Sequence, residues 1–528
     1  MKPEAAKPAT TEKKGIFFRF IHGVEVVGNK LPHPFYLFCI LIVVAIVLSV
    51  IFAGASVTYL SASSGGGAEE TVTTTIRNLL NKETINYVTE NMYDIYYNFS
   101  PMMMMGLLML SIGLAEQVGF FSALIRRTIL GAKPALVFAI VSFIAINAHI
   151  ASNAGVLGCT AVAAAVFASL GYNPWLGIIL AYAAGNAGMA ASIFGGNLDV
   201  LVSGINTTVC ENLGIDTSTV HVLEHWYFLM ASLVVLTIVY TLLTTKFVQG
   251  YIGPPKDLSL VRDAGADQEV TPLERKGLRN AGIAAIVYVL VIVALCIPKN
   301  SFFRADDGSL LPNSPLLRSV LTLLFLFFLI TALVYGRTTK KIAKMNDLPR
   351  LMANSIHSMT TFMVIALPAS LFIYLFNASN IPTFLGATGA QWLKESGING
   401  FFLLVVVALL TCFLDLFMTS GSSKWMFLAP ILIPMFYAVD ISPAMTSLAY
   451  RIGDSAMNAV APISSDVALI VGLLVKYNTD PDKKPGMGNV FAGCMPYAVV
   501  TIACQLVLFG IWWVLGLPLG PGVSQFVS

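Results

Sequence analysis

The sequence carries little charge. Only 11% of its 528 residues are Asp, Glu, Lys or Arg, and 56% are hydrophobic, whereas soluble globular proteins carry about 25% charged residues. This scarcity excludes an ordinary soluble domain and indicates a polytopic membrane protein. The formal net charge of +3 is spread over many short loops. We therefore expect a lipid bilayer, and no nucleic acid, as a partner.

The sequence also lacks the motifs of nucleotide-dependent and hydrolytic enzymes. It has no HExxH, GxSxG, Walker A or GxGxxG match, and its seven cysteines show no CxxC or zinc-like spacing. The segment His221–His225, HVLEH, does fit the H-x-x-E-H pattern of inverted zinc peptidases. It falls in a predicted external loop without a third-ligand motif, so a membrane-embedded metallohydrolase is the weaker alternative. A channel is another alternative, although no filter or charged ring is evident. We expect no enzyme and no cofactor.

Long apolar runs predict the membrane crossings, because a crossing helix needs about 20 apolar residues. Nine runs lie at residues 35–54, 101–123, 174–206, 225–245, 278–297, 316–335, 352–376, 444–475 and 488–517. Two further apolar stretches, 134–172 and 400–440, are too long for one helix. Both are interrupted by glycine, proline or polar residues, so we expect each to be broken.

Basic residues in the short loops set the orientation. Those on the predicted cytoplasmic side include Lys13, Lys14, Arg19 and Lys30 at the N-terminus, Arg126, Arg127 and Lys133, and Lys340, Lys341 and Lys344. The positions of these basic residues fit a single orientation of the chain if each broken stretch enters and leaves the membrane on the same side, as a re-entrant hairpin or as paired crossings. The N-terminus then lies in the cytoplasm and the C-terminus outside, in a multi-pass protein of the cell (inner) membrane.

A short motif occurs twice. Leu180–Met189 reads LAYAAGNAGM and Leu448–Met457 reads LAYRIGDSAM, with an offset of 268 residues (454 − 186). Pro174 and Pro443 precede the two copies, and each copy follows a broken stretch. The loop count gives the copies opposite directions, which is an inverted-topology repeat. In secondary transporters with such repeats, substrate and ions bind near the midplane, where helices are broken.

The repeat divides the chain into five segments. They are a cytoplasmic arm at 1–34, a first repeat at 35–245 with hairpin 134–172, a linker at 246–315 with connecting helix 278–297 and an external loop, a second repeat at 316–518 with hairpin 400–440, and a C-terminal tail at 519–528.

The second copy of the motif has gained charge. Arg451 stands where the first copy has Ala183, and Asp454 stands where it has Asn186. A charged side chain at the centre of a membrane helix costs about 2.5–3.5 kcal/mol, and such residues are usually functional. Alternatively, Arg451 and Asp454 satisfy each other as an i,i+3 ion pair. Both interpretations can hold, because a pair can lock one state and open to ligand in another.

The two broken stretches contain small polar residues where a hairpin tip is expected. The first has Asn153 and Gly155, and the second has Ser422 followed by Lys424 and Trp425. Such tips can offer helix N-termini to an anion and carbonyls or hydroxyls to Na⁺. Taken alone, the small residues also fit simple helix packing. Lys424 either snorkels to the interface or supplies a fixed positive charge.

Three further carboxylates lie in apolar surroundings. They are Asp199, Asp415 and Asp466. Each can ligate a cation, carry a proton or cap a half-helix. His149, beside the first tip, is either a proton relay or a satisfied buried histidine.

Four segments carry a family resemblance, namely SGSSKWMFLAPILIPMF, ISPAMTSLAYRIGDSAMNAVAP, GLPLGPG and NLDVLVSGI. They resemble the AbgT, or p-aminobenzoyl-glutamate transporter, family of the ion-transporter superfamily. The resemblance implies a homodimer with nine transmembrane helices and two re-entrant hairpins per subunit. It also implies a scaffold part, a mobile transport part and cation-driven transport. Uptake of p-aminobenzoyl-glutamate and export of sulfonamide-type antimetabolites are both attributed to members.

The family's functional positions are matched in residue type here. They fall on Asp199, Ser422, Trp425, Pro443, Arg451, Asp454 and Pro462. The chain departs from the family pattern at Asn153, where an aspartate is usual, at Asp415, where an asparagine is usual, and around Asp466. The first two changes resemble an exchange of one carboxylate between the repeats.

The sequence therefore predicts an all-α polytopic membrane protein with about nine transmembrane helices, two re-entrant hairpins and an inverted-topology repeat. We expect an elevator-like secondary transporter of a small organic anion such as p-aminobenzoyl-glutamate, or of another such as a dicarboxylate, with Na⁺ or H⁺ as the coupling ion. The expected substrate-binding residues are Asn153, Gly155, Ser422, Trp425, Arg451, Asp454 and Pro462. The expected ion-coupling residues are Asn186, Asp199, Asp415, Pro443, Asp454 and Asp466. Na⁺ is expected near Asn153, Asp199, Ser422 and Asp454.

Overall fold

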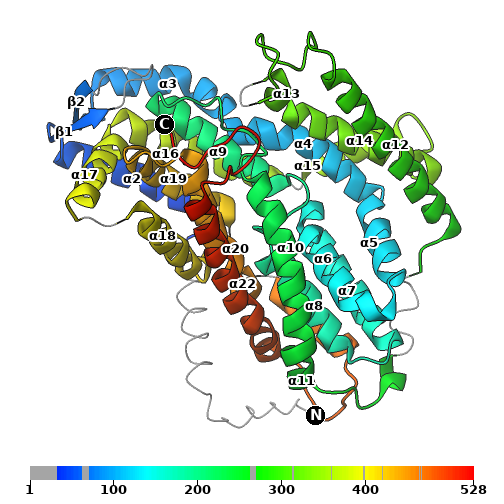
Figure 1. Ribbon diagram of the computed structural model, residues 1–528. Helices are drawn as coiled ribbons and strands as arrows, with labels where there is room; N and C mark the ends of the chain where they lie inside the picture. Colours follow the sequence, from blue (N-terminus) through cyan, green and yellow to red (C-terminus); the bar gives the residue numbers. More distant parts are fainter. Residues whose placement is uncertain are drawn as a thin grey trace, which may run out of the picture.

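The computed structural model describes residues 32–61, 70–261, 269–311, 314–357, 359–396, 399–418, 420–462, 464 and 466–527. Lys13, Lys14, Arg19 and Lys30 of the predicted N-terminal arm lie outside the described residues. The described chain is largely helical (Figure 1). Its strands β1 (Ser56–Ser61) and β2 (Glu70–Thr75), which we did not predict, pair as an antiparallel hairpin.

Seven of the nine predicted crossings each contain one long helix, although the runs 101–123 and 352–376 also include part of a neighbouring helix. These long helices are α2 (Pro34–Ile51), α4 (Ser100–Gln117), α10 (Trp226–Leu243), α12 (Pro272–Cys296), α14 (Val320–Thr338), α16 (Thr360–Ala378) and α22 (Met487–Leu515). Eight helical stretches among the described residues are long and apolar enough to cross a membrane, and the eighth, Pro134–Ala151, belongs to the first broken stretch.

The other two predicted crossings are wrong as continuous helices. Residues 174–206 contain all of α8 (Pro174–Ala187) and the start of α9 (Asn197–Leu213). Residues 444–475 cover nearly all of α20 (Pro443–Met457) and α21 (Asp466–Lys476). Glycines at 188, 195 and 196 and a proline at 462 accompany the breaks, because glycine weakens a helix and proline cannot continue one. Such breaks are tolerated at membrane depth where protein surrounds the free backbone groups.

The two over-long stretches form helical hairpins, as predicted. Helices α6 (Val137–Ala148) and α7 (Ser152–Ser169) pack on α8, and helices α18 (Gly400–Asp415) and α19 (Gly421–Tyr437) pack on α20. The glycine of each repeated motif permits this contact. A β-carbon on Gly185 would lie 2.7 Å from Val156 Cγ1, and one on Gly453 would lie 2.1 Å from the Ala408 carbonyl oxygen.

The remaining helices connect or flank these elements. They are α3 (Lys82–Tyr97), α5 (Phe120–Leu130), α11 (Gln249–Ile252), α13 (Pro315–Arg318), α15 (Asp347–His357) and α17 (Ile381–Ser396). Short 3₁₀ turns span Pro134–Leu136, His149–Ala151, Leu258–Val261 and Asn458–Val460, and a π-helical turn spans Thr244–Val248. Helices α3 and α17 fall in segments that we expected to be loops.

The two broken helices, which are α8 with α9 and α20 with α21, run in opposite directions. The start of α8 contacts the end of α11, since Asn173 Nδ2 lies 3.3 Å from the Gly253 carbonyl. The start of α20 contacts the C-terminal segment, where the Ser442 amide donates to the Gln525 carbonyl at 2.9 Å. Residues 226–252, from α10 to α11, form one helical stretch that connects these two ends of the molecule (Figure 1). Its first turn contacts the C-terminal segment, because the Tyr227 amide donates to the Leu519 carbonyl, and its last turn is the end of α11. A helix of that length extends about 40 Å, so α8 and α20 enter from opposite faces. This confirms the inverted repeat.

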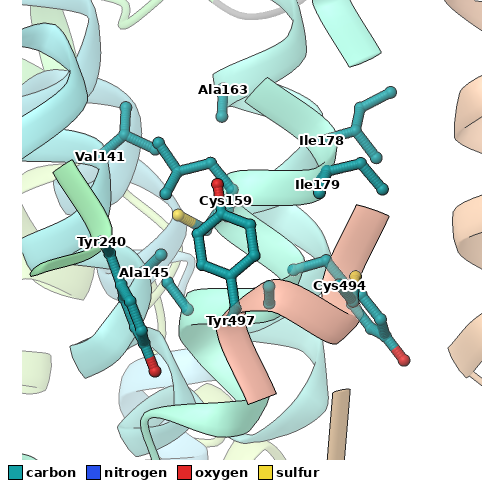
Figure 2. Packing of buried hydrophobic residues seen from close by; sticks show 14 of the residues in the cluster. Val141, Ala145, Cys159, Ala163, Ile178, Ile179, Tyr240, Cys494 and Tyr497 are labelled. Carbon is teal, nitrogen blue, oxygen red and sulfur yellow. The ribbon is translucent and has the colours of Figure 1, made fainter. Parts of the chain in front are cut away.

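A buried apolar cluster fixes the first hairpin against its neighbours. Figure 2 labels Val141, Ala145, Cys159, Ala163, Ile178, Ile179, Tyr240, Cys494 and Tyr497 within it. The two labelled tyrosines have paired hydroxyls, Tyr240 with Thr501 at 2.5 Å and Tyr497 with Thr244 at 2.6 Å. The cluster therefore joins α6, α7, α8, α10 and α22 without leaving these hydroxyls unsatisfied.

Candidate transport site

The two broken helices meet at a buried ion pair. Arg451, on α20, is fully buried, and its Nη1 donates to Oδ1 of Asp199. Asp199 is the third residue of α9, and its Oδ2 accepts a 2.6 Å hydrogen bond from the Gly196 amide. Arg451 Nη2 also reaches the Met189 carbonyl, at 3.3 Å. Arg451 thus holds both ends of the break between α8 and α9, while its Nε has no hydrogen-bond partner among the described residues.

The predicted ion pair between Arg451 and Asp454 is wrong. Asp454 Oδ1 lies 2.7 Å from Lys424 Nζ and accepts a 3.0 Å hydrogen bond from the Tyr450 hydroxyl. Each of the two residues forms an ion pair with an opposite charge on another helix. Arg451 faces α9, and Asp454 faces the second hairpin.

Lys424 supplies a fixed positive charge inside the protein. Its side chain is 1% exposed, which excludes snorkelling to the interface. Its ammonium group pairs with Asp415, the last residue of α18, as well as with Asp454 on α20. Because Lys424 lies in the first turn of α19, it joins both arms of the second hairpin to the broken helix. Asp415 Oδ2 has no partner among the described residues.

The tip of the second hairpin lies against the same carboxylate. A β-carbon on Gly421 would approach Asp454 Oδ2 to 2.7 Å, and the Gly421 carbonyl accepts from the Tyr450 hydroxyl. Ser422 beside it is half-buried. Trp425 is buried and stacks on Tyr450, with 4.6 Å between ring centroids and 27° between planes. Its indole Nε1 donates to Asn206 Oδ1 at 2.8 Å.

The first hairpin is less closely joined to these charges. Asn153 is exposed at the start of α7. Gly155 allows the tight tip, since its β-carbon would lie 2.3 Å from the Ala148 carbonyl oxygen. His149 is buried, with Nδ1 2.6 Å from the Ile146 carbonyl and with Nε2 unpartnered among the described residues. The ring lies near Gly196 at the break.

Four other expected residues flank the breaks. Asn186 donates to the Tyr182 carbonyl of its own helix at 3.0 Å. Pro443 is buried as the first residue of α20, Pro462 is half-buried after it, and Asp466 is buried as the first residue of α21. They shape the helix starts and breaks, whereas the ion pairs are made by Asp199, Asp415, Lys424, Arg451 and Asp454.

The HVLEH segment is buried between α9 and α10. Nε2 of His221 lies 3.0 Å from the Pro521 carbonyl, and Nε2 of His225 lies 2.9 Å from the Ala444 carbonyl. In the part of the chain that the structure describes, no group of three His, Cys, Asp or Glu side chains is placed to hold a metal. Sequence reasoning missed the role of Glu224, which accepts a 2.9 Å hydrogen bond from Asn206. The sequence feature that could have indicated this role is the presence of a glutamate and an asparagine in largely apolar surroundings.

Three comparisons place this architecture among known proteins. The AbgT putative transporter family matches residues 19–527. A p-aminobenzoyl-glutamate transport protein of Escherichia coli (strain K12) is 33% identical over 505 residues, which is 96% of each chain. Both matches are to transporters and extend over nearly the whole chain.

Two solved structures are similar. MtrF of Neisseria gonorrhoeae, described as illuminating a class of antimetabolite efflux pumps, matches with a TM-score of 0.87 and 31% identity over 96% of this chain and 100% of that one. The YdaH transporter of Alcanivorax borkumensis, described as having an unusual topology, matches with a TM-score of 0.83 and 26% identity over 93% of this chain and 100% of that one. The family match and the identity to the Escherichia coli protein confirm the resemblance seen in the sequence. The chain belongs to the AbgT putative transporter family.

Proposed function

We propose that the protein is a cation-coupled secondary active transporter of a small organic anion, with p-aminobenzoyl-glutamate as the first candidate. The observation that carries the proposal is the set of five buried charged residues where the broken helices meet the second hairpin. Buried charges are expensive and are retained where they do chemical work. Transporters with inverted repeats bind their substrates at such breaks.

Arg451 is the proposed anchor for a substrate carboxylate. A guanidinium group binds a carboxylate through two parallel hydrogen bonds, a geometry that lysine cannot reproduce. Asp199 occupies one nitrogen, while Nε has no partner among the described residues. A substrate carboxylate can therefore bind beside Asp199 or replace it. Trp425, Ser422 and the second tip would face the aromatic part of the substrate, and Asn153, Gly155 and Pro462 would contact it from the first tip and the second break.

The same charges provide a reason for cation coupling. Asp199, Asp415 and Asp454 carry three negative charges when ionised, and Lys424 and Arg451 carry two positive charges. One negative charge is left over, and a bound Na⁺ or proton would neutralise it. Asp415 Oδ2, which has no partner among the described residues, is the proposed proton acceptor. Na⁺ would lie near Asn153, Asp199, Ser422 and Asp454, with Asn186, Pro443 and Asp466 shaping the helix ends around it.

We further propose a homodimer in the inner membrane, with the N-terminus in the cytoplasm and the C-terminus outside. Each hairpin packs on its own broken helix, so the two hairpins and the two broken helices form one compact unit. This unit would move as an elevator against the surrounding long helices and carry the site across the membrane.

Flux into proteoliposomes tests the proposal. Radiolabelled p-aminobenzoyl-glutamate should accumulate when a Na⁺ gradient or a pH gradient is imposed, and the gradient that drives it identifies the coupling ion. A second candidate function is export of sulfonamide-type antimetabolites, which is supported by the 31% identity to MtrF. Sulfonamide flux in the opposite direction, without p-aminobenzoyl-glutamate flux, would favour export. Flux of a dicarboxylate alone would favour a different organic anion, and absence of any flux under both gradients would contradict the proposal.

A further inference from the structure

Glu224 is a buried carboxylate that the proposed transport cycle does not use. It lies between α9 and α10, outside the candidate membrane spans, and is 1% exposed. Its Oε1 accepts a 2.9 Å hydrogen bond from Asn206 Nδ2, and its Oε2 has no partner among the described residues. An ionised carboxylate with a buried, unpaired oxygen is unfavourable, whereas a protonated one is tolerated.

Hydrogen-bond chemistry fixes how Asn206 is oriented beside it. The indole of Trp425 can only donate, so the Asn206 atom that faces it must be Oδ1. The amide nitrogen then faces Glu224 Oε1 and Ser447 Oγ, each at 2.9 Å. One asparagine thus connects Glu224 to the tryptophan that stacks on Tyr450, and the Tyr450 hydroxyl contacts Asp454.

The charged and titratable groups around Glu224 come from three places. On its own segment, His225 Nε2 lies 3.9 Å from Oε1, but it is also 2.9 Å from the Ala444 carbonyl, to which only a protonated nitrogen can donate. His221 is the second histidine there. Helix α9 brings Asp199 and Cys210, and helix α20 brings Arg451. The C-terminal segment, residues 517–527, contributes no ionisable side chain. Burial raises the pKa of the Glu224 carboxyl to about 8.

We propose that Glu224 is a proton-binding residue that positions Trp425 through Asn206, so that the transport site binds its anion more tightly when Glu224 is protonated. Ionisation would draw the amide of Asn206 toward the carboxylate and loosen the hydrogen bond to Trp425. It would also add a negative charge within the field of Arg451, where the anion is proposed to bind. Because linkage is reciprocal, binding of the anion would be accompanied by proton uptake at Glu224.

The first test needs no substrate. Infrared difference spectra of the purified, full-length protein between about pH 6 and about pH 9.5 should show the carbonyl stretch of a protonated carboxylic acid that titrates. Glu224→Gln should lose a component of this band, whatever Asp415, the proposed proton acceptor of the transport site, contributes to it. Glu211→Gln, which changes an exposed glutamate on α9, should keep that component. A spectrum that is unchanged in Glu224→Gln would overturn the proton-binding site.

The second test rests on the proposed function and uses p-aminobenzoyl-glutamate. The Kd of the wild-type protein should rise about fivefold across this pH range, the equivalent of one hydrogen bond. Glu224→Gln imitates the protonated acid, so its Kd should stay at the low-pH value throughout. The same pH-dependent rise in Glu224→Gln would overturn the link between Glu224 and the site. Absence of wild-type binding at every pH, with the infrared band still titrating, would refute the proposed substrate and leave the proton-binding site supported.

Discussion

At the scale of single residues, Lys424 determines whether the second hairpin can stay closed on α20. Its ammonium group is the shared partner of Asp415 and Asp454, and all three side chains are no more than 2% exposed. Removing one partner from a buried ion pair is much more destabilising than removing the whole pair, since it leaves an uncompensated charge.

Lys424→Met should therefore lower the free energy of unfolding by about 3–5 kcal/mol, seen as a lower melting temperature in detergent. The double variant Lys424→Met with Asp415→Asn should recover part of the loss, because it removes one of the two stranded charges. Lys341→Met, at an exposed lysine, is the control and should melt like the wild type. A double variant that melts below the single variant would contradict the charge explanation.

The charged residues could be identified from the sequence, but their pairing could not. Arg451 and Asp454 were predicted as neighbours because helical spacing is the only proximity that a sequence displays. The actual partner of Arg451 is Asp199, 252 residues away along the chain. The roles of Asn206 and Glu224 were missed for the same reason, because their hydrogen bonds form only when α9, α19 and α20 pack together.

At the scale of elements, the hairpins dock on the broken helices through glycine. Gly453 contacts the backbone of α18, and Gly185, its counterpart in the first repeat, contacts Val156 of α7. A methyl group opposite a backbone carbonyl can be accommodated only by moving the helix, whereas one opposite a side-chain methyl can be relieved by rotation.

Gly453→Ala should consequently destabilise the protein more than Gly185→Ala does, by about 1–3 kcal/mol for the former. Gly472→Ala is a matched control on α21, where a β-carbon would meet nothing within 4 Å. It should leave the melting temperature unchanged or raise it, because alanine favours a helix over glycine by about 1 kcal/mol. Equal melting temperatures for Gly453→Ala and Gly472→Ala would refute the docking role.

Hydropathy predicted seven of the long helices and both hairpins but not the interruptions that follow α8 and α20. Apolar residues continue on both sides of each interruption, so a window of about 20 residues averages across it. Helices α3 and α17 were missed because neither is apolar enough to be recognised as a crossing.

At the scale of the whole molecule, the repeated motif correctly predicted two copies in opposite directions. The structure shows how the two repeats contact each other. Helix α19 of the second repeat packs on α9 of the first repeat, and α7 of the first repeat contacts α21 of the second repeat. Because each repeat covers a break in the other, one repeat alone cannot enclose the charged residues.

Cysteine labelling tests the opposite faces. Lys256 and Ser524 are exposed near the start of α8 and the start of α20, respectively. In a variant without the seven native cysteines, none of which forms a disulfide, an impermeant maleimide added to intact cells should label Ser524→Cys and spare Lys256→Cys. Inverted vesicles should give the reverse. Labelling of both positions from the same side would contradict the inverted arrangement.

Arg451 is proposed to bind the substrate where the broken helices meet. The most direct measurement is the affinity of purified, thermally intact Arg451→Lys for p-aminobenzoyl-glutamate. This variant keeps the positive charge beside Asp199 but cannot form the two-pronged contact with a carboxylate. Loss of one charge-assisted hydrogen bond predicts an affinity at least about tenfold weaker. Arg350→Lys, at an exposed arginine, is the control and should retain wild-type affinity. Wild-type affinity in Arg451→Lys would contradict a substrate-binding role and leave Arg451 as a structural partner of Asp199 alone.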